Sequence, residues 1–173
     1  MDEDVAAHLA SLVDAIYRAL GRHCAAVRDD AYLVRLYEMA RAFGDLSITW
    51  REALSGPPRE PFGPLVGALE RAFAEDESGA LVLYVVAAIV APRLLVSLRD
   101  ARERVGGDPL ATALLDETAR VTVRQLRELS SLPTHDEGDD PAWRARARAL
   151  ADELDAHGWS DSFGVGGRLP PPV

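Results

Sequence analysis

The chain has 173 residues, enough for one domain with a substantial core, and its hydrophobic content of 48% and charged content of 27% are typical of a globular protein. Its formal net charge of −9 repels phosphate groups, which disfavours nucleic acids and anionic membranes as partners. Cys24 is the only cysteine, so disulfides within the chain and thiolate metal clusters are excluded.

The first half of the chain predicts two long helices, over residues 4–27 and 30–54. In the first of them, apolar residues recur every three or four positions, which is the spacing of one helix face. The second helix stops at the sequence Ser-Gly-Pro-Pro, because glycine and proline terminate helices. Residues 55–78 then form a long connection rich in proline and glycine, with one short helix over 64–75. The apolar positions of the first helix are Val5, Leu9, Leu12, Ile16, Leu20 and Val27.

The second half predicts three more helices and a tail. Residues 79–105 are apolar on nearly all sides at first, so this third helix should be the most buried, with a kink at Pro92. Asp108 caps a fourth helix that runs to about residue 131. After an acidic loop, a shorter fifth helix ends near residue 156. We expect residues 1–157 to form one helical bundle and residues 158–173 a Gly/Pro-rich tail.

The order of these elements predicts an all-α fold of two helical hairpins joined by one long crossover. Ferritin-like bundles have this connectivity, whereas up-down bundles have three short loops. The apolar run at residues 80–92 has 13 residues, which is too short to span a bilayer. The acidic N-terminus lacks the basic region of a signal peptide. We therefore expect a cytoplasmic protein.

Three segments carry a resemblance to the ferritin-like superfamily of carboxylate-bridged di-iron proteins. The sequences "LYVVAAIVAPRLLVSLRD" at 83–100 and "DPLATALLDETARVTVRQLREL" at 108–129 resemble the third and fourth helices of such proteins. The sequence "LYEMARAFGDLSITWREAL" at 36–54 resembles the second helix. The resemblance covers about residues 4–131 and implies a ferritin-like four-helix bundle with a short C-terminal helix.

The resemblance also indicates that the metal site has been lost. In metal-bearing relatives, the second and fourth helices each carry an inward Glu-x-x-His motif. In this chain the fourth-helix motif falls on Thr122 and Gln125. The second-helix motif falls on Gly44 and Ser47, or on Phe43 and Leu46 in the adjacent register. Neither register provides a metal ligand, so we expect no metal and no cofactor.

Helical periodicity also predicts no inward metal ligands, independently of the ferritin-like resemblance. Advancing about 100° per residue, Asp14, Glu38, Asp45 and Asp116 point away from the apolar stripes, and Glu117 lies at an edge. Ser47, Thr118, Thr122 and Gln125 point inward. A di-iron site needs carboxylates and histidines that converge in the core, and these helices direct neutral polar groups there instead.

These inward polar groups have two interpretations. Threonine hydroxyls can bond to carbonyls of the preceding turn, and a glutamine can bond to another helix. Alternatively, they form the polar floor of an apolar ligand pocket. The residues of this candidate ligand site are Ser47, Trp50, Tyr84, Thr118, Thr122 and Gln125.

Histidines do not predict a catalytic site. His23 and Cys24 are adjacent and point about 100° apart, so His23 is interpreted as a buried or helix-end histidine. His8, His135 and His157 are expected on an exposed face, in the acidic loop and at a helix end. No catalytic residue is predicted, and whether the chain is an enzyme stays open.

The sequence predicts a metal-free binding or scaffold protein for a protein partner or a small hydrophobic molecule, with a homodimer as one candidate assembly. An alternative is a non-redox enzyme, such as a cyclase or isomerase, that uses the emptied core as a pocket. A weaker alternative is a di-iron oxygenase. The segment from Ser162 to Leu169 resembles the cargo-loading peptides of encapsulin cargos, which implies an encapsulin shell as a further candidate partner.

Overall fold

The computed structural model describes residues 3–54, 63–74, 76–105, 107–129, 141–157 and 159. Every regular element in these residues is helical, so the predicted all-α fold is confirmed for them. The elements are α1 (Glu3–His23), α2 (Asp30–Ala53), α3 (Gly63–Phe73), α4 (Ala80–Val85), the π-helix η1 (Val86–Val90), α5 (Ala91–Arg104), α6 (Pro109–Leu129) and α7 (Pro141–Ala156). The predicted acidic loop and the segment from Ser162 to Leu169 lie outside the described residues.

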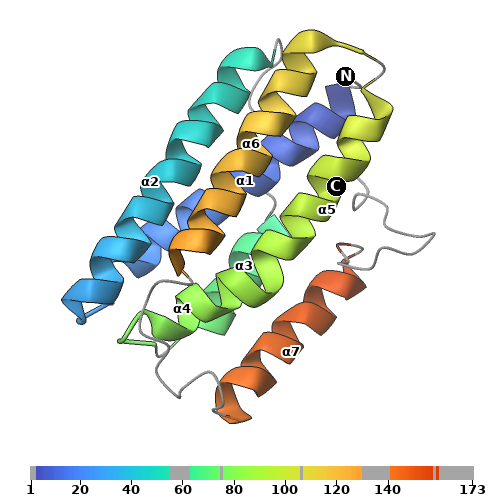
Figure 1. The fold of residues 1–173 in the computed structure, drawn as a ribbon. Coiled ribbons are helices and arrows are strands. Elements are labelled where there is room, and N and C mark those ends of the chain that lie inside the picture. The colour runs from blue at the N-terminus through green and yellow to red at the C-terminus, as the bar shows by residue number, and fades with distance from the viewer. Residues whose placement is uncertain are drawn as a thin grey trace.

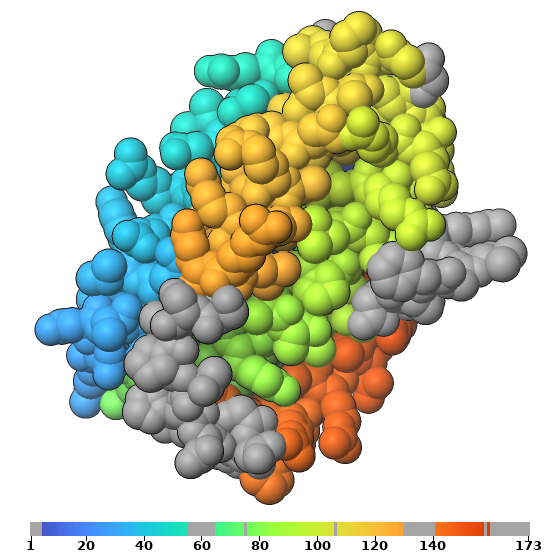
Figure 2. Space-filling model, viewed as in Figure 1, coloured from blue at the N-terminus to red at the C-terminus, as the bar shows by residue number. Residues whose placement is uncertain are grey.

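Four long helical segments pack in a ring. α1 contacts α2, α2 contacts α6, α6 contacts α5, and α5 contacts α1 (Figure 1). In the space-filling view, α6 lies between α2 and α5 on the face turned to the viewer (Figure 2). The short helix α3 packs on α1, and α7 packs on α3 and η1. Apolar side chains from all of these helices form one continuous core.

Aspartate side chains begin three of the helices. Asp29 accepts hydrogen bonds from the backbone N–H groups of Ala31 and Tyr32, as its sequence position predicts. Asp108 accepts in the same way from the first turn of α6. The buried Asp76 does the same for α4, since its carboxylate accepts from the N–H groups of Gly79 and Val82. Side-chain oxygens therefore satisfy N–H groups that a helix start leaves without partners.

The predicted third helix is one continuous stretch from Ala80 to Arg104 with a wide turn in its middle. Within this π-turn, the N–H of Ala91 donates to the carbonyl of Val86, five residues back. Pro92 follows directly, and its ring lacks an N–H and crowds the carbonyl four residues earlier in a regular α-helix. A wider turn at this point relieves that conflict, so the helix continues through the proline.

This stretch is also longer and more apolar than the 13-residue run in the sequence indicates. The segment Ala80–Arg104 meets the length and hydropathy expected of a membrane-spanning helix, and 67% of its most apolar window is buried inside the molecule. A helix in the core of a helical protein is buried to a similar extent. Val86 is buried as predicted, whereas Ile89 is half-buried and Ala88 is exposed.

α1 is packed on several sides, which corrects two predictions. It contacts α2, α3 and α5, so a single apolar stripe does not describe its buried surface. Asp14, predicted to face solvent, is 6% exposed and points toward α2. His8, predicted on an exposed face, is also buried. Both predictions were wrong because they assumed that the side opposite the apolar stripe is free.

The end of α7 is held to α5 by a buried arginine. Arg93 is 1% exposed, and its Nε donates to the carbonyl of Trp159 at 3.0 Å while Nη2 donates to Asp155 at 2.9 Å. The indole Nε1 of Trp159 donates to Ser97 Oγ at 2.9 Å. Trp159 was assigned to the tail from the sequence, but it is a buried part of the packed structure.

Candidate functional site

A hydrogen-bonded chain joins α2 to α6 inside the core. The indole Nε1 of the fully buried Trp50 donates to Thr118 Oγ1 at 3.0 Å, and that hydroxyl donates to the carbonyl of Leu114 at 2.8 Å. One turn further on, Thr122 Oγ1 donates to the carbonyl of Thr118 at 2.8 Å. The two threonines point inward as predicted, and each hydroxyl bonds to the preceding turn of its own helix.

Gln125, also inward as predicted, meets an arginine from α2. Its side-chain oxygen accepts from Nη2 of the buried Arg35 at 3.0 Å. The same guanidinium forms ion pairs with Glu38 at 2.9 Å and with Glu128 at 2.5 Å. Gln125 therefore belongs to a polar contact between α2 and α6, near the opposite end of α2 from Trp50.

Ser47 belongs to a third group, centred on Asp14. Ser47 is buried as predicted, and its hydroxyl donates to Asp14 Oδ1 at 2.8 Å. Arg51 and Arg18 form ion pairs with the same carboxylate. Burial by itself raises the pKa of Asp14, but the hydrogen bonds from Ser47 and Arg51 and the attraction of Arg18 outweigh it, so the pKa lies below its ordinary value of 3.8.

The six residues of the predicted ligand site thus lie in separate places. Trp50, Thr118 and Thr122 share one part of the core, while Ser47 and Gln125 bond to different partners elsewhere on α2 and α6. Tyr84 is half-buried and packs beside Trp143 of α7, with their ring centroids 6.1 Å apart. Their common role as one pocket remains a prediction.

The positions that a second-helix metal motif would occupy hold no ligand set. Phe43 and Leu46 are buried in the apolar core. Gly44 lies on the outer side of α2, where a Cβ atom would come within 3.0 Å of the ring of Tyr17. Across the described ranges, no three His, Cys, Asp or Glu side chains are grouped so that they could hold a metal ion.

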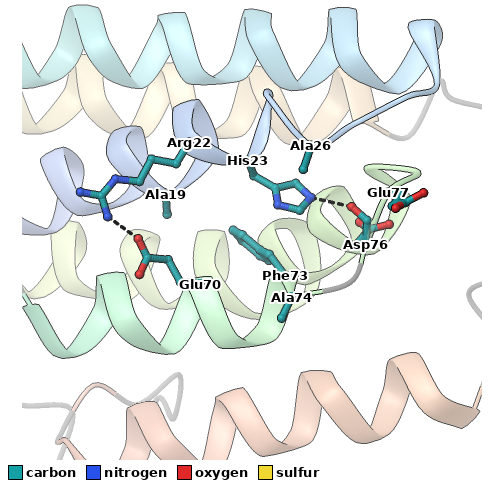
Figure 3. A pocket seen from close by; sticks show the side chains of 9 residues that line it. All are labelled: Ala19, Arg22, His23, Ala26, Glu70, Phe73, Ala74, Asp76 and Glu77. Atoms are coloured by element: carbon teal, nitrogen blue, oxygen red, sulfur yellow. Dashed lines mark hydrogen bonds and ion pairs between the residues drawn. The ribbon is translucent and has the colours of Figure 1, made fainter.

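Figure 3 shows a pocket of about 360 Å³ between α1 and α3. His23, at the end of α1 as predicted, bonds through Nε2 to the carbonyl of Asp76 at 2.9 Å, and its ring packs against Phe73. At the other end of the pocket, Arg22 forms an ion pair with Glu70. His23 and Arg22 of the α1 side thus both bond to groups on the opposite side of this pocket.

A second depression, of about 420 Å³, lies between α2 and α6. It is lined mostly by charged side chains of both signs, and these include the buried Arg35, whose ion pairs are described above. Because its walls carry three arginines and three carboxylates, it offers no excess of one charge for a ligand. These three arginines are Arg35, Arg41 and Arg124.

A larger depression, of about 740 Å³, is the α1–α2 groove on the outer side of those two helices. One wall comes from α1 and the turn that follows it, and the other comes from α2. Burial raises the pKa of the Cys24 thiol, which lines the α1 wall. The lining residues are Tyr17, Gly21, Cys24, Ala25, Tyr37, Ala40, Arg41, Gly44, Asp45, Ile48 and Arg51.

A row of outward residues on α2, which we call the outer stripe of α2, runs along this wall, and all of them except Val34 line the groove. Its residues are Val34, Tyr37, Arg41, Gly44 and Ile48, spaced alternately by three and four positions. Val34, Tyr37 and Ile48 are 59%, 62% and 54% exposed, which is unusual for large apolar side chains. This spacing is present in the sequence, but it was missed because α2 was assigned only one apolar face.

Comparison of the chain with protein-family models, with curated proteins and with solved structures finds no match.

The two core threonines provide a matched test of their roles. Thr118→Val leaves the buried indole N–H of Trp50 without an acceptor and should lower the free energy of unfolding by about 1–3 kcal/mol. Thr122→Val removes only a bond to its own helix, so stability should stay unchanged or rise slightly. Chemical denaturation of both variants measures the difference. Equal effects would mean that the bond from Trp50 to Thr118 contributes nothing.

The carboxylate of Asp14 should make stability depend on pH. Because its pKa is lower folded than unfolded, its contribution is present above the ordinary value of 3.8 and is lost as pH falls through the folded pKa. Asp14→Asn should thus be less stable than the parent at neutral pH, and the gap should narrow in acid. Denaturation of both proteins from pH 7 to pH 2 at one protein concentration measures this.

The control for this experiment is Asp152→Asn, since Asp152 is exposed on α7. The control should follow the parent at every pH. A gap between Asp14→Asn and the parent that stays constant into acid would show that the ion pairs of Asp14 do not lower its pKa.

Proposed function

We propose that this chain is a metal-free binding or scaffold protein that engages an apolar helix of a partner polypeptide in the α1–α2 groove. The observation that carries the proposal is the outer stripe of α2. Its residues recur at the spacing by which one helix packs along another, and three of them are large apolar groups exposed to solvent. Several large apolar side chains exposed along one line of a helix favour an interaction site.

The dimensions and borders of the groove support a helical partner. Two antiparallel helices form its walls, so it is an elongated channel in which the side chains of a third helix can pack. Its apolar floor is bordered by Arg41, Asp45 and Arg51. Apolar contact along the middle with charges at the rim is the usual composition of a protein interface.

The core favours this role over the cyclase or isomerase alternative. A catalytic pocket needs polar groups directed at a substrate, whereas the hydroxyls of Thr118 and Thr122 and the indole of Trp50 are bonded within the chain. We also propose that the architecture is a ferritin-like bundle without its metal site. Its two hairpins would be the α1–α2 and α5–α6 pairs, with residues 54–79 as the crossover.

Photo-crosslinking in the cells that make this protein tests the binding role. Tyr37 is replaced by p-benzoylphenylalanine, a photoreactive amino acid of similar shape, and the cells are irradiated. We expect an adduct with a polypeptide chain, because Tyr37 lies on the proposed contact. The same replacement at Leu110, which is 67% exposed at the start of α6 and does not line the groove, should give none.

A second substitution identifies the surface responsible. Ile48→Arg places a charge in the apolar part of the groove and should abolish the adduct formed at position 37. Absence of any polypeptide adduct at position 37, or an adduct that is unaffected by Ile48→Arg, would contradict the proposed function.

A further inference from the structure

We propose that the occupant of the α1–α2 groove is a second copy of this chain, whose α2 lies antiparallel to the first. This inference rests on the proposed function, because it uses the same groove and names the partner. A two-fold contact requires a surface that is complementary to itself, in both shape and charge. The outer stripe of α2 meets that requirement.

Two charges at the groove have no ion pair within the described residues. Arg41 and Asp45 lie one turn apart at the rim of the groove, and both are exposed. Neither forms an ion pair with any side chain in the described part of the chain, although Arg18, Arg35 and Arg51 nearby all do. Opposite charges that remain unpaired on an otherwise apolar surface are suited to a partner that carries both signs.

Two antiparallel copies of α2 can be placed in a register that pairs these residues. When the two-fold axis passes between Ala42 and Phe43, Tyr37 of each copy faces Ile48 of the other. In the same register, Arg41 of each copy faces Gly44 of the other and lies beside Asp45 of that copy. This register therefore matches Tyr37 with Ile48 and brings the opposite charges together at once, while Val34 of each copy falls opposite Arg51 of the other.

Orientation follows from the same residues. In a parallel, in-register pair, Arg41 would face Arg41 and Asp45 would face Asp45, and like charges placed directly opposite one another destabilise an interface. The antiparallel pair instead makes two Arg41–Asp45 contacts related by the two-fold axis. Charge complementarity thus selects the antiparallel arrangement of two copies.

Light scattering after size-exclusion chromatography tests this directly. The purified chain should have twice its mass of 18.7 kDa. Ile48→Arg should halve the measured mass without changing the helical circular dichroism spectrum, because the residue is 54% exposed. Leu110→Arg, at an exposed apolar position outside the groove, should keep the mass of two chains.

The two charges allow a sharper test that does not alter apolar contacts. Arg41→Asp and Asp45→Arg should each run at the mass of one chain, because each creates two like-charge contacts across the axis. An equal mixture of the two variants should regain the mass of two chains, since every contact in the mixed pair joins opposite charges. That rescue requires residues 41 and 45 of one copy to lie against the same two residues of the other.

The single cysteine gives an independent readout. Cys24 lines the groove beside α2, so a second copy should cover its thiol. Ellman's reagent should therefore react more slowly with the parent than with Ile48→Arg. Equal rates would contradict coverage of the groove.

The proposal would be overturned if the purified chain runs as a single copy at its highest soluble concentration. It would also be overturned if the mass of two chains persists in Ile48→Arg and in both charge variants. A single copy in solution together with an adduct between position 37 and a different protein would leave the proposed function standing and remove only the second copy as partner.

Discussion

A buried indole N–H must find a hydrogen-bond acceptor, and for Trp50 that acceptor is the hydroxyl of Thr118 on α6. This hydrogen bond limits how far α2 can shift along the axis of α6. The same hydroxyl donates a hydrogen bond to the carbonyl of Leu114, so it acts as both acceptor and donor inside the core. The same rule explains Arg35 and Gln125, which bond to each other at the other end of the same pair of helices. Trp50 with Thr118, and Arg35 with Gln125, thus join α2 to α6.

The interior polar groups of Trp50, Thr118 and Gln125 are bonded within the chain. We therefore expect recognition on the outside of the molecule. α2 is the element where this matters most, because it carries two different faces. One side supplies Leu36, Met39, Phe43 and Trp50 to the core. The outer stripe of α2 repeats at the same helical spacing but lies beside the α1–α2 groove. Gly44 lies within α2 although glycine lowers helix stability. Its lack of a side chain allows the ring of Tyr17 to lie close against the helix.

The sequence predicted most of the helices and the inward direction of Thr118, Thr122, Gln125 and Ser47, because these depend on local periodicity. It failed where tertiary packing decides. Asp14 lies opposite the main apolar stripe of α1, yet α2 covers it and supplies Ser47 and Arg51 as partners. Trp159 follows α7 in a sequence that reads as a tail, and only the folded position of Arg93 and Ser97 explains its burial. The residues of the outer stripe of α2 recur at helical spacing in the sequence. They were not recognised because only one apolar face was assigned to α2.

Thr118, Thr122 and Gln125, the polar side chains that α6 directs into the interior, are engaged in hydrogen bonds within the chain, and we infer that they hold no metal ion. Elemental analysis of the protein, purified from cells grown with added iron, manganese and zinc, tests this most directly. We predict that each metal is present at far less than one atom per chain. A stoichiometric metal that is lost when interior residues such as Gln125 are replaced would contradict the claim.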